Sequence, residues 1–220
     1  MKKLFIVLLC LFLTLFTLSC SKSNGLVPFV SELRSNVYEG KTENLVVKAG
    51  YGFKESPYSN DGEVKEKTYA LTFKIISDAP HDTAYTVSFD YDGNHFSQAF
   101  KFNPIAHSLT AIVEVENFNE KEFSIIIQSG NQTHNVTMRS TIPDGTIDYT
   151  TALSFLEKNQ PELIKAFSDT DGNFNAEIRI RILVKDGKAY WYVGLGQPDR
   201  LKALLLDGKT GEVLAIRDIF

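Results

Sequence analysis

Cysteine is almost absent from this sequence. The two that occur, Cys10 and Cys20, both lie within the first twenty residues. A disulfide scaffold, a cysteine nucleophile and every cysteine-based zinc site are therefore excluded from the body of the protein. Its folded part must be held together by packing alone.

An excess of positive charge is also lacking. The formal net charge is -4, from 23 basic and 27 acidic residues. Lys2 and Lys3 lie in a segment that we expect to be removed, which leaves 21 basic residues against 27 acidic ones. Nucleic-acid binding proteins typically carry a basic stripe, so a nucleic-acid partner is not expected. The 43% hydrophobic content and only 7 prolines indicate an ordinary folded chain.

No constellation of catalytic or metal-binding residues is visible in the sequence. The four histidines are scattered and form no H-E-x-x-H pair, and no G-x-S-x-G occurs. The acidic segment from Asp169 to Glu177 has glycine at its fourth position and glutamate at its ninth, where an EF-hand needs the sixth and twelfth. A helix-to-strand turn explains it better. We predict no cofactor and no metal, and leave open catalysis by residues distant in sequence.

The N-terminus has the order of features that directs export. Two lysines precede an apolar run from Leu4 to Phe16, which is short for a membrane span and typical of a signal peptide. The sequence Thr17-Leu18-Ser19-Cys20 resembles the lipobox of bacterial lipoproteins, in which the cysteine is diacylated and becomes the first residue. Residues 1–19 are thus predicted to be a lipoprotein signal peptide, and Cys20 a lipid anchor on the extracytoplasmic face of the cell membrane. The alternatives are an ordinary signal peptide or an uncleaved anchor.

Two folded regions are expected after the anchor. Residues 20–42 are assigned to a tether and a short helix, because Val30, Leu33 and Val37 have helical spacing. Residues 43–142 alternate with a period of two in seven short runs, which predicts an antiparallel, immunoglobulin-like β-sandwich. The runs are 44–53, 67–76, 84–91, 95–102, 108–115, 123–128 and 134–138.

Residues 143–220 follow a segment rich in turn-forming residues and predict a helix plus a four-stranded antiparallel meander. Asp186-Gly187 is a favoured type I′ hairpin turn, which sets Lys185 opposite Lys188 and fixes every pair beyond it. Trp191 then shares an apolar face with the isoleucines of the preceding strand, and we expect helices to cover that face. The opposite face is predicted to remain open and to bind a partner, the alternative being that it packs against the β-sandwich. Its candidate residues are Tyr190, Tyr192, Arg181, Leu204 and Leu206.

The C-terminal third resembles PepSY-type domains. The resemblance rests on Ala189-Tyr-Trp-Tyr-Val193 and on the later segment that ends in Asp207-Gly-Lys-Thr-Gly211-Glu212-Val213. PepSY modules are small exported domains with a helix on an antiparallel sheet, linked to regulation of peptidases or to the cell wall. The resemblance implies no catalytic residues.

Taken together, the sequence predicts a membrane-anchored, non-catalytic binding or regulatory module of the cell envelope, including modulation of a peptidase. Its partners would be the membrane, through the anchor, and an unknown envelope protein or cell-wall component. The alternatives are an accessory envelope enzyme and a structural subunit of an envelope complex.

Overall fold

The computed structural model describes residues 25–55, 66–76, 83–104 and 107–219. Of these residues, 60% lie in strands and 11% in helices, so the described part of the chain is mostly β. The first elements are the 3-10 turn η1 (Val27–Phe29), β1 (Val30–Lys41), β2 (Val46–Glu55), β3 (Lys67–Ile75), β4 (Tyr85–Tyr91), β5 (Asn94–Ala99), β6 (Lys101–Asn103), β7 (Ser108–Glu114), β8 (Glu122–Ser129) and β9 (Gln132–Ser140). The later ones are α2 (Tyr149–Asn159), α3 (Pro161–Ala166), β10 (Glu177–Lys185), β11 (Lys188–Gln197), β12 (Arg200–Asp207) and β13 (Val213–Ile219).

Strands β1 to β9 form a nearly closed, barrel-like antiparallel sheet. From β1 the sheet runs one way through β2, β3, β7 and β6, and the other way through β9, β8, β4 and β5. Inward-facing side chains from both arms fill the barrel with one apolar core, which includes the fully buried Val47, Phe73, Val87 and Ile127. Each of the seven predicted β runs coincides with one of these strands or, for 95–102, with β5 and β6.

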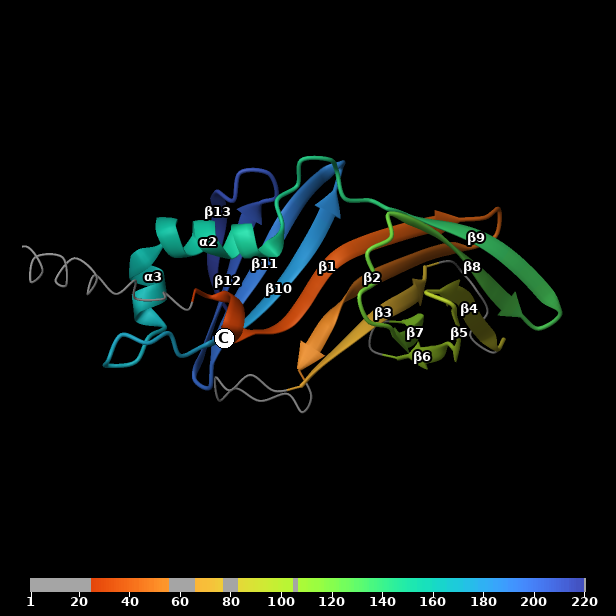
Figure 1. Cartoon of the computed structure of the whole chain (residues 1–220), viewed down its shortest axis with the longest axis horizontal. Coiled ribbons are helices and arrows are strands. Elements are labelled where there is room, and N and C mark those ends of the chain that lie inside the picture. Colours follow the sequence, from red (N-terminus) through yellow and green to blue (C-terminus); the bar gives the residue numbers. More distant parts are fainter. Residues whose placement is uncertain (1–24, 56–65, 77–82, 105–106, 220) are drawn as a thin grey trace, which may run out of the picture.

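The remaining strands extend the same sheet. Strand β10 pairs in parallel with β1, and β11, β12 and β13 follow as an antiparallel meander. Figure 1 shows β1 and β2 running from the helix-covered end of the molecule into the barrel. The predicted fold class, a β-sandwich followed by a separate helix plus four-stranded meander, is therefore wrong: one barrel-like sheet continues into the meander.

The short helix predicted before residue 42 is also wrong, because Val30 to Lys41 form β1. The strand carries two irregularities, between Val30 and Glu32 and between Arg34 and Asn36. An extra residue at a bulge breaks the period of two. The apolar residues of β1 consequently fall at spacings of three and four, which imitate a helix.

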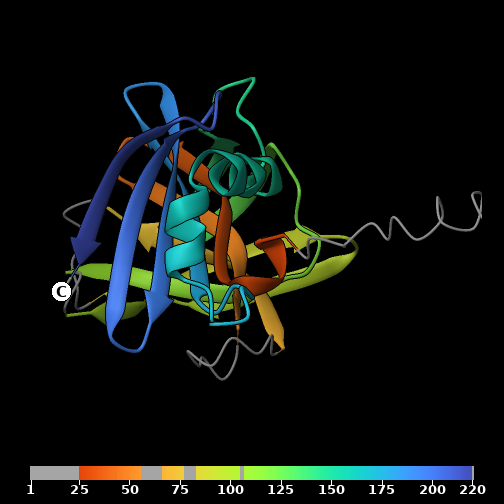
Figure 2. The same ribbon diagram turned by 90° about the vertical axis from the view of Figure 1, so that its left-hand side faces the viewer.

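Helices α2 and α3 lie on one face of the meander (Figures 1 and 2). The carboxylate of Asp148 caps α2 by accepting a hydrogen bond of 2.7 Å from the amide of Thr151. Under the helices lies a second apolar core, which contains Leu153, Leu156 and the alternate residues of β10 and β11. The opposite face of β10 and β11 is not covered by these helices.

The hairpin register predicted from the turn is confirmed. Asp186 and Gly187 have φ values of 51° and 71°, as a type I′ turn requires, and Lys185 pairs with Lys188. Trp191 is 2% exposed within the helix-covered core, and its Nε1 donates a hydrogen bond of 3.0 Å to the carbonyl of Ile147. Its role is structural, as predicted.

Candidate functional site

A groove of about 940 Å³ lies on the face of the sheet turned away from the helices. Its walls come from β1, β2, β3, β7 and β10, so it crosses the junction between the barrel and the meander. Arg181 and Leu183 line it from β10, whereas Ile178 and Ile180 on the other face of that strand are buried in the helix-covered core. Cavities of this size suit small-molecule ligands.

The floor of the groove is made of small residues on adjacent strands. Gly50 pairs with Thr72, and Gly52 pairs with Ala70. A Cβ added at Gly52 would lie 1.8 Å from the carbonyl oxygen of Leu33, so no larger residue fits there. Larger side chains on this row would fill the groove, and their absence keeps it hollow.

The groove is cationic although the protein is acidic. Its lining contains five cationic side chains and two carboxylates. The cations are Arg34, Lys48, Lys54, Lys74 and Arg181, and the carboxylates are Glu32 and Glu39. Because the chain as a whole has a net charge of -4, this excess is a local feature of the groove. It favours an anionic ligand.

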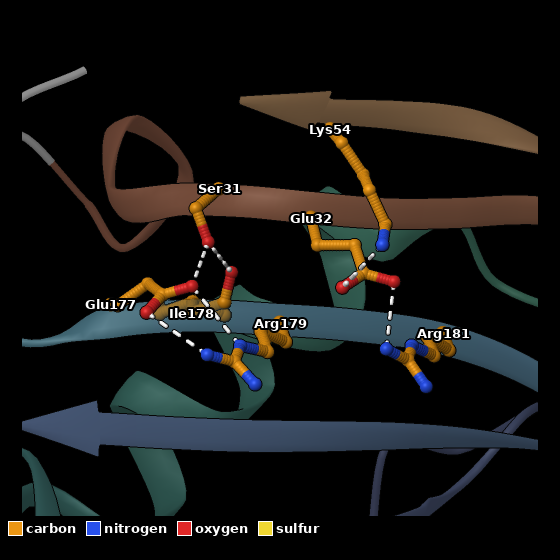
Figure 3. A network of polar contacts seen from close by, with 7 residues as sticks. All are labelled: Ser31, Glu32, Lys54, Glu177, Ile178, Arg179 and Arg181. Carbon is orange, nitrogen blue, oxygen red and sulfur yellow. Dashed lines mark hydrogen bonds and ion pairs between the residues drawn. The ribbon is translucent and has the colours of Figure 1, made fainter. Parts of the chain in front are cut away.

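Glu32 is the carboxylate at the β1–β10 end of the groove (Figure 3). Its Oε1 lies 2.7 Å from Nη2 of Arg181, and its Oε2 lies 3.9 Å from Nζ of Lys54. Both oxygens are thus directed at cations other than Arg34. At the far end Glu39 lies 2.7 Å from Lys41 and 3.5 Å from Lys48, which hold the pKa of Glu39 below its usual value.

Arg34 and Arg181 are direct neighbours across the parallel strand pair. Burial and the neighbouring charge of Arg181 lower the pKa of Arg34 from the usual arginine value, and Glu32 offsets part of the effect. Within the described part of the chain, Nε of Arg34 and Nε of Arg181 are both buried without a hydrogen-bond partner. Buried N–H groups normally have a partner, so these two guanidinium groups have donor capacity left for a ligand.

A second polar contact ties the same two strands together beside the groove (Figure 3). The Oγ of Ser31 donates a hydrogen bond of 2.5 Å to Oε1 of Glu177, and Nε of Arg179 lies 3.1 Å from that oxygen. Burial raises the pKa of Glu177, and the bond from Ser31 offsets only part of the rise. This buried cluster stabilises the junction on which the groove is built.

The structure brings some of the predicted partner-binding residues together and separates others. Arg181 lines the groove, and Tyr192 and Tyr190 lie half-buried on the same open face, opposite Arg181 and Leu183. Leu204 and Leu206 do not belong to this face. They pair with Val193 and Trp191 and are 1% and 0% exposed in the helix-covered core.

The error comes from the length of one turn. A loop over residues 196–200 would pair Leu195 with Leu201 and place Leu204 opposite Tyr192. In the structure β11 continues to Gln197, which pairs with Arg200, and Leu205 lies opposite Tyr192. A slip of one residue moves every side chain of a strand to the other face.

Sequence reasoning missed Arg34, Lys54 and the small-residue floor. These residues lie on β1, β2 and β3, and only the parallel pairing of β1 with β10 brings Arg34 to Arg181. The glycines at 50 and 52, inside an alternating run, were the available signal, because glycine within a strand often marks a close backbone approach. Cys20 lies outside the described residues.

Across the described ranges no group of three or more histidine, cysteine, aspartate or glutamate side chains could hold a metal ion. In the same part of the chain, neither helix has the length and apolar character needed to cross a membrane. Besides two ion-paired glutamates, the groove's charged groups are arginines and lysines, which commonly bind oxyanions.

Comparisons with protein-family models, with curated proteins and with solved structures found no match to this chain. The argument for its function therefore rests on the geometry and charge of the groove.

Proposed function

We propose that this protein is a lipid-anchored, non-catalytic binding module on the extracytoplasmic face of the cell membrane, and that its groove holds a small anionic ligand. The observation that carries the proposal is the cationic lining over a floor of small residues. A hollow of this volume with a few charged groups at its wall has the form of a ligand site.

The location rests on the N-terminal sequence. The basic start, the apolar run and the residues up to Cys20 support export and lipid attachment. Acyl chains on Cys20 would hold the protein at the membrane, where two chains suffice for stable anchoring. Replacing Cys20 with alanine should release the protein from membranes, and unchanged retention would contradict the anchor.

The place of the groove supports a regulatory role. Arg34 belongs to the strand that starts the barrel, and Arg181 to the strand that starts the meander. A ligand held by both would stabilise the junction between them. The resemblance of the C-terminal third to PepSY modules supports a role of this kind, in which ligand occupancy is passed to an envelope partner such as a peptidase.

The groove is tested by filling it. Ala70→Trp places an indole on the floor opposite Gly52, whereas Ser124→Trp places the same ring on the exposed outer face of β8. Protein isolated from its native membrane would be analysed by native mass spectrometry for a bound anionic molecule. We expect the molecule in the wild type and in Ser124→Trp but not in Ala70→Trp. An equal amount in all three proteins would contradict the proposal.

A second candidate function is capture of a protein partner through Tyr190 and Tyr192. Their half-buried rings lie on the open face beside Arg181 and Leu205, where amphipathic aromatic side chains favour contact with a partner. Crosslinking on intact cells would test it. Loss of one crosslinked species in both Tyr190→Ala and Tyr192→Ala would support it, and unchanged capture would contradict it.

A further inference from the structure

Two arginines of like charge stand side by side at one end of the groove. Arg34 and Arg181 are register partners in the parallel pair of β1 and β10, and both line the groove. Neighbouring strands lie about 4.8 Å apart, so the two side chains start from adjacent positions on one face. Their two positive charges repel each other unless an anion lies between or above the guanidinium groups.

The protein supplies too little negative charge for this pair. Glu32 carries one charge, and its two oxygens face Arg181 and Lys54. Three cations thus share one carboxylate at this end of the groove. The buried Nε atoms of Arg34 and Arg181 remain without a partner among the described residues. One further oxyanion would balance the charge and occupy these donors.

The glycine floor leaves room for the side chain of Arg34 to lie against it. A Cβ on Gly50 would come within 2.8 Å of Cδ of Arg34, so the arginine side chain rests against the glycine. The aliphatic part of Arg34 is thereby held in place. A guanidinium fixed in this way loses little freedom when it binds a carboxylate or phosphate with two parallel hydrogen bonds.

Away from the arginines the groove also presents exposed apolar side chains, beside the charged Lys48 and Lys74. The next row of the sheet runs from Val37 through Gly50 and Thr72 to Ile112. Ile112 is 58% exposed and Ile76 is 45% exposed, and both line the groove. Ile112 lies three strands from Arg34, which is about 14 Å across the sheet. Exposed isoleucines at this distance suit an apolar chain attached to the anionic group.

From these contacts we infer that the Arg34–Arg181 pair binds the oxyanion head of a small amphiphile, whose apolar chain crosses the glycine floor toward Ile112 and Ile76. The head is a carboxylate or a phosphate, because both match the fork of the guanidinium group. Glu32 holds Arg181 while the site is empty and competes with the ligand for it. This inference rests on the proposed function and specifies the ligand class of the same groove.

The test uses amphiphiles of one chain length and three heads: dodecanoate and dodecyl phosphate, each below its micelle concentration, and uncharged dodecanol, below its solubility limit. Isothermal titration would measure their affinities for the wild type. We expect binding of at least one anionic probe and at least tenfold weaker binding of dodecanol. Tighter binding of dodecyl phosphate would identify phosphate as the head, and tighter binding of dodecanoate would identify carboxylate. Equal affinity for all three, or no binding, would overturn the inference.

Variants assign the effect to the two arginines. Arg34→Gln and Arg181→Gln should each weaken binding of the anionic probe about tenfold or more, because each removes charged hydrogen bonds worth roughly a factor of 10 to 100 in affinity. Glu32→Gln should strengthen binding of the probe, since the carboxylate that competes for Arg181 is lost. Arg217→Gln, on the open face of β13 at the far edge of the meander, is the matched control and should leave affinity unchanged. Weakening in the control as well would overturn the assignment.

Two further variants separate failure of the inference from failure of the proposed function. Arg34→Lys keeps the positive charge but loses the forked guanidinium group, so its affinity for the anionic probe should lie between those of the wild type and Arg34→Gln. An intermediate affinity would also show that the loss in Arg34→Gln is not due to misfolding. Ala70→Trp blocks the whole groove. Binding lost in Ala70→Trp but kept in both glutamine variants would refute the arginine site alone. Binding kept in Ala70→Trp as well would refute the groove.

Discussion

Ser31 on β1 and Glu177 on β10 are joined by a hydrogen bond of 2.5 Å across 146 residues of sequence. Both side chains are buried, at 3% and 5% exposure. The bond stands where the barrel strand and the meander strand run in parallel, and Ser31 Oγ also lies 3.3 Å from the carbonyl of Ile178. The bond therefore helps to hold together the two parts of the sheet that form the walls of the groove.

Removing the hydroxyl should weaken this junction. Ser31→Ala leaves the buried carboxyl of Glu177 without one donor, which costs about 1–3 kcal/mol. Urea unfolding followed by circular dichroism would measure the loss. Ser124→Ala, on the exposed outer face of β8, is the control and should change the unfolding free energy by less than about 0.5 kcal/mol. Equal stability of the two variants would mean that the Ser31 bond contributes nothing to the junction.

The pH dependence of stability should report on Glu177. Burial raises the pKa of this carboxyl in the folded protein above its usual value of 4.5. The folded state then binds more protons than the unfolded state, so this group's contribution to stability is largest below pH 4.5 and falls as the pH rises through the raised pKa. Melting temperatures of wild type and Glu177→Gln, compared from acidic to neutral pH, should show the wild type losing stability relative to the variant. A difference that does not change with pH would contradict the raised pKa.

Glycine at position 52 should be irreplaceable. An alanine there puts its Cβ 1.8 Å from the backbone oxygen of Leu33, and backbone cannot move aside cheaply. We expect Gly52→Ala to destabilise the protein by about 3 kcal/mol or more, at the upper end of overpacking effects. Gly194→Ala is the matched control, since its Cβ would meet nothing closer than 3.5 Å. Similar unfolding midpoints for the two variants would contradict the close approach of Gly52 on β2 to Leu33 on β1.

Trp191 and its tyrosine neighbours should respond differently to truncation. Trp191→Ala removes a core ring and the bond to Ile147, which costs about 3–5 kcal/mol. Tyr192→Ala, on the open face, should cost less than about 1.5 kcal/mol, because the ring is only half-buried. Chemical unfolding by circular dichroism compares them. A large loss for Tyr192→Ala would place that ring in a core.

The sequence predicted local pairing better than long-range pairing. The turn at Asp186-Gly187 fixed the register of β10 and β11, and with it the burial of Trp191, because a two-residue turn leaves one register. The next connection carries no such turn, and one residue of slip put Leu204 and Leu206 on the wrong face.

The groove itself could not be predicted from the sequence. Its two arginines are neighbours only because β1 and β10 pair in parallel. The sequence of β1 does not indicate a strand, because its bulges give the apolar residues a helical spacing. Arg181 could be placed on an open face from its own hairpin. Its partner Arg34, the counterion Glu32 and the glycine floor lie more than a hundred residues away in sequence.

The most direct test of the binding account observes the Nε–H groups of Arg34 and Arg181, which have no hydrogen-bond partner among the described residues. Arginine Nε–H resonances of the nitrogen-15-labelled protein would be assigned with Arg34→Lys and Arg181→Lys, then followed while dodecanoate or dodecyl phosphate is added. The account predicts saturable shifts of the Arg34 and Arg181 signals, with the Arg217 signal unmoved. Saturation of the protein with either probe while both groove signals stay in place would contradict it.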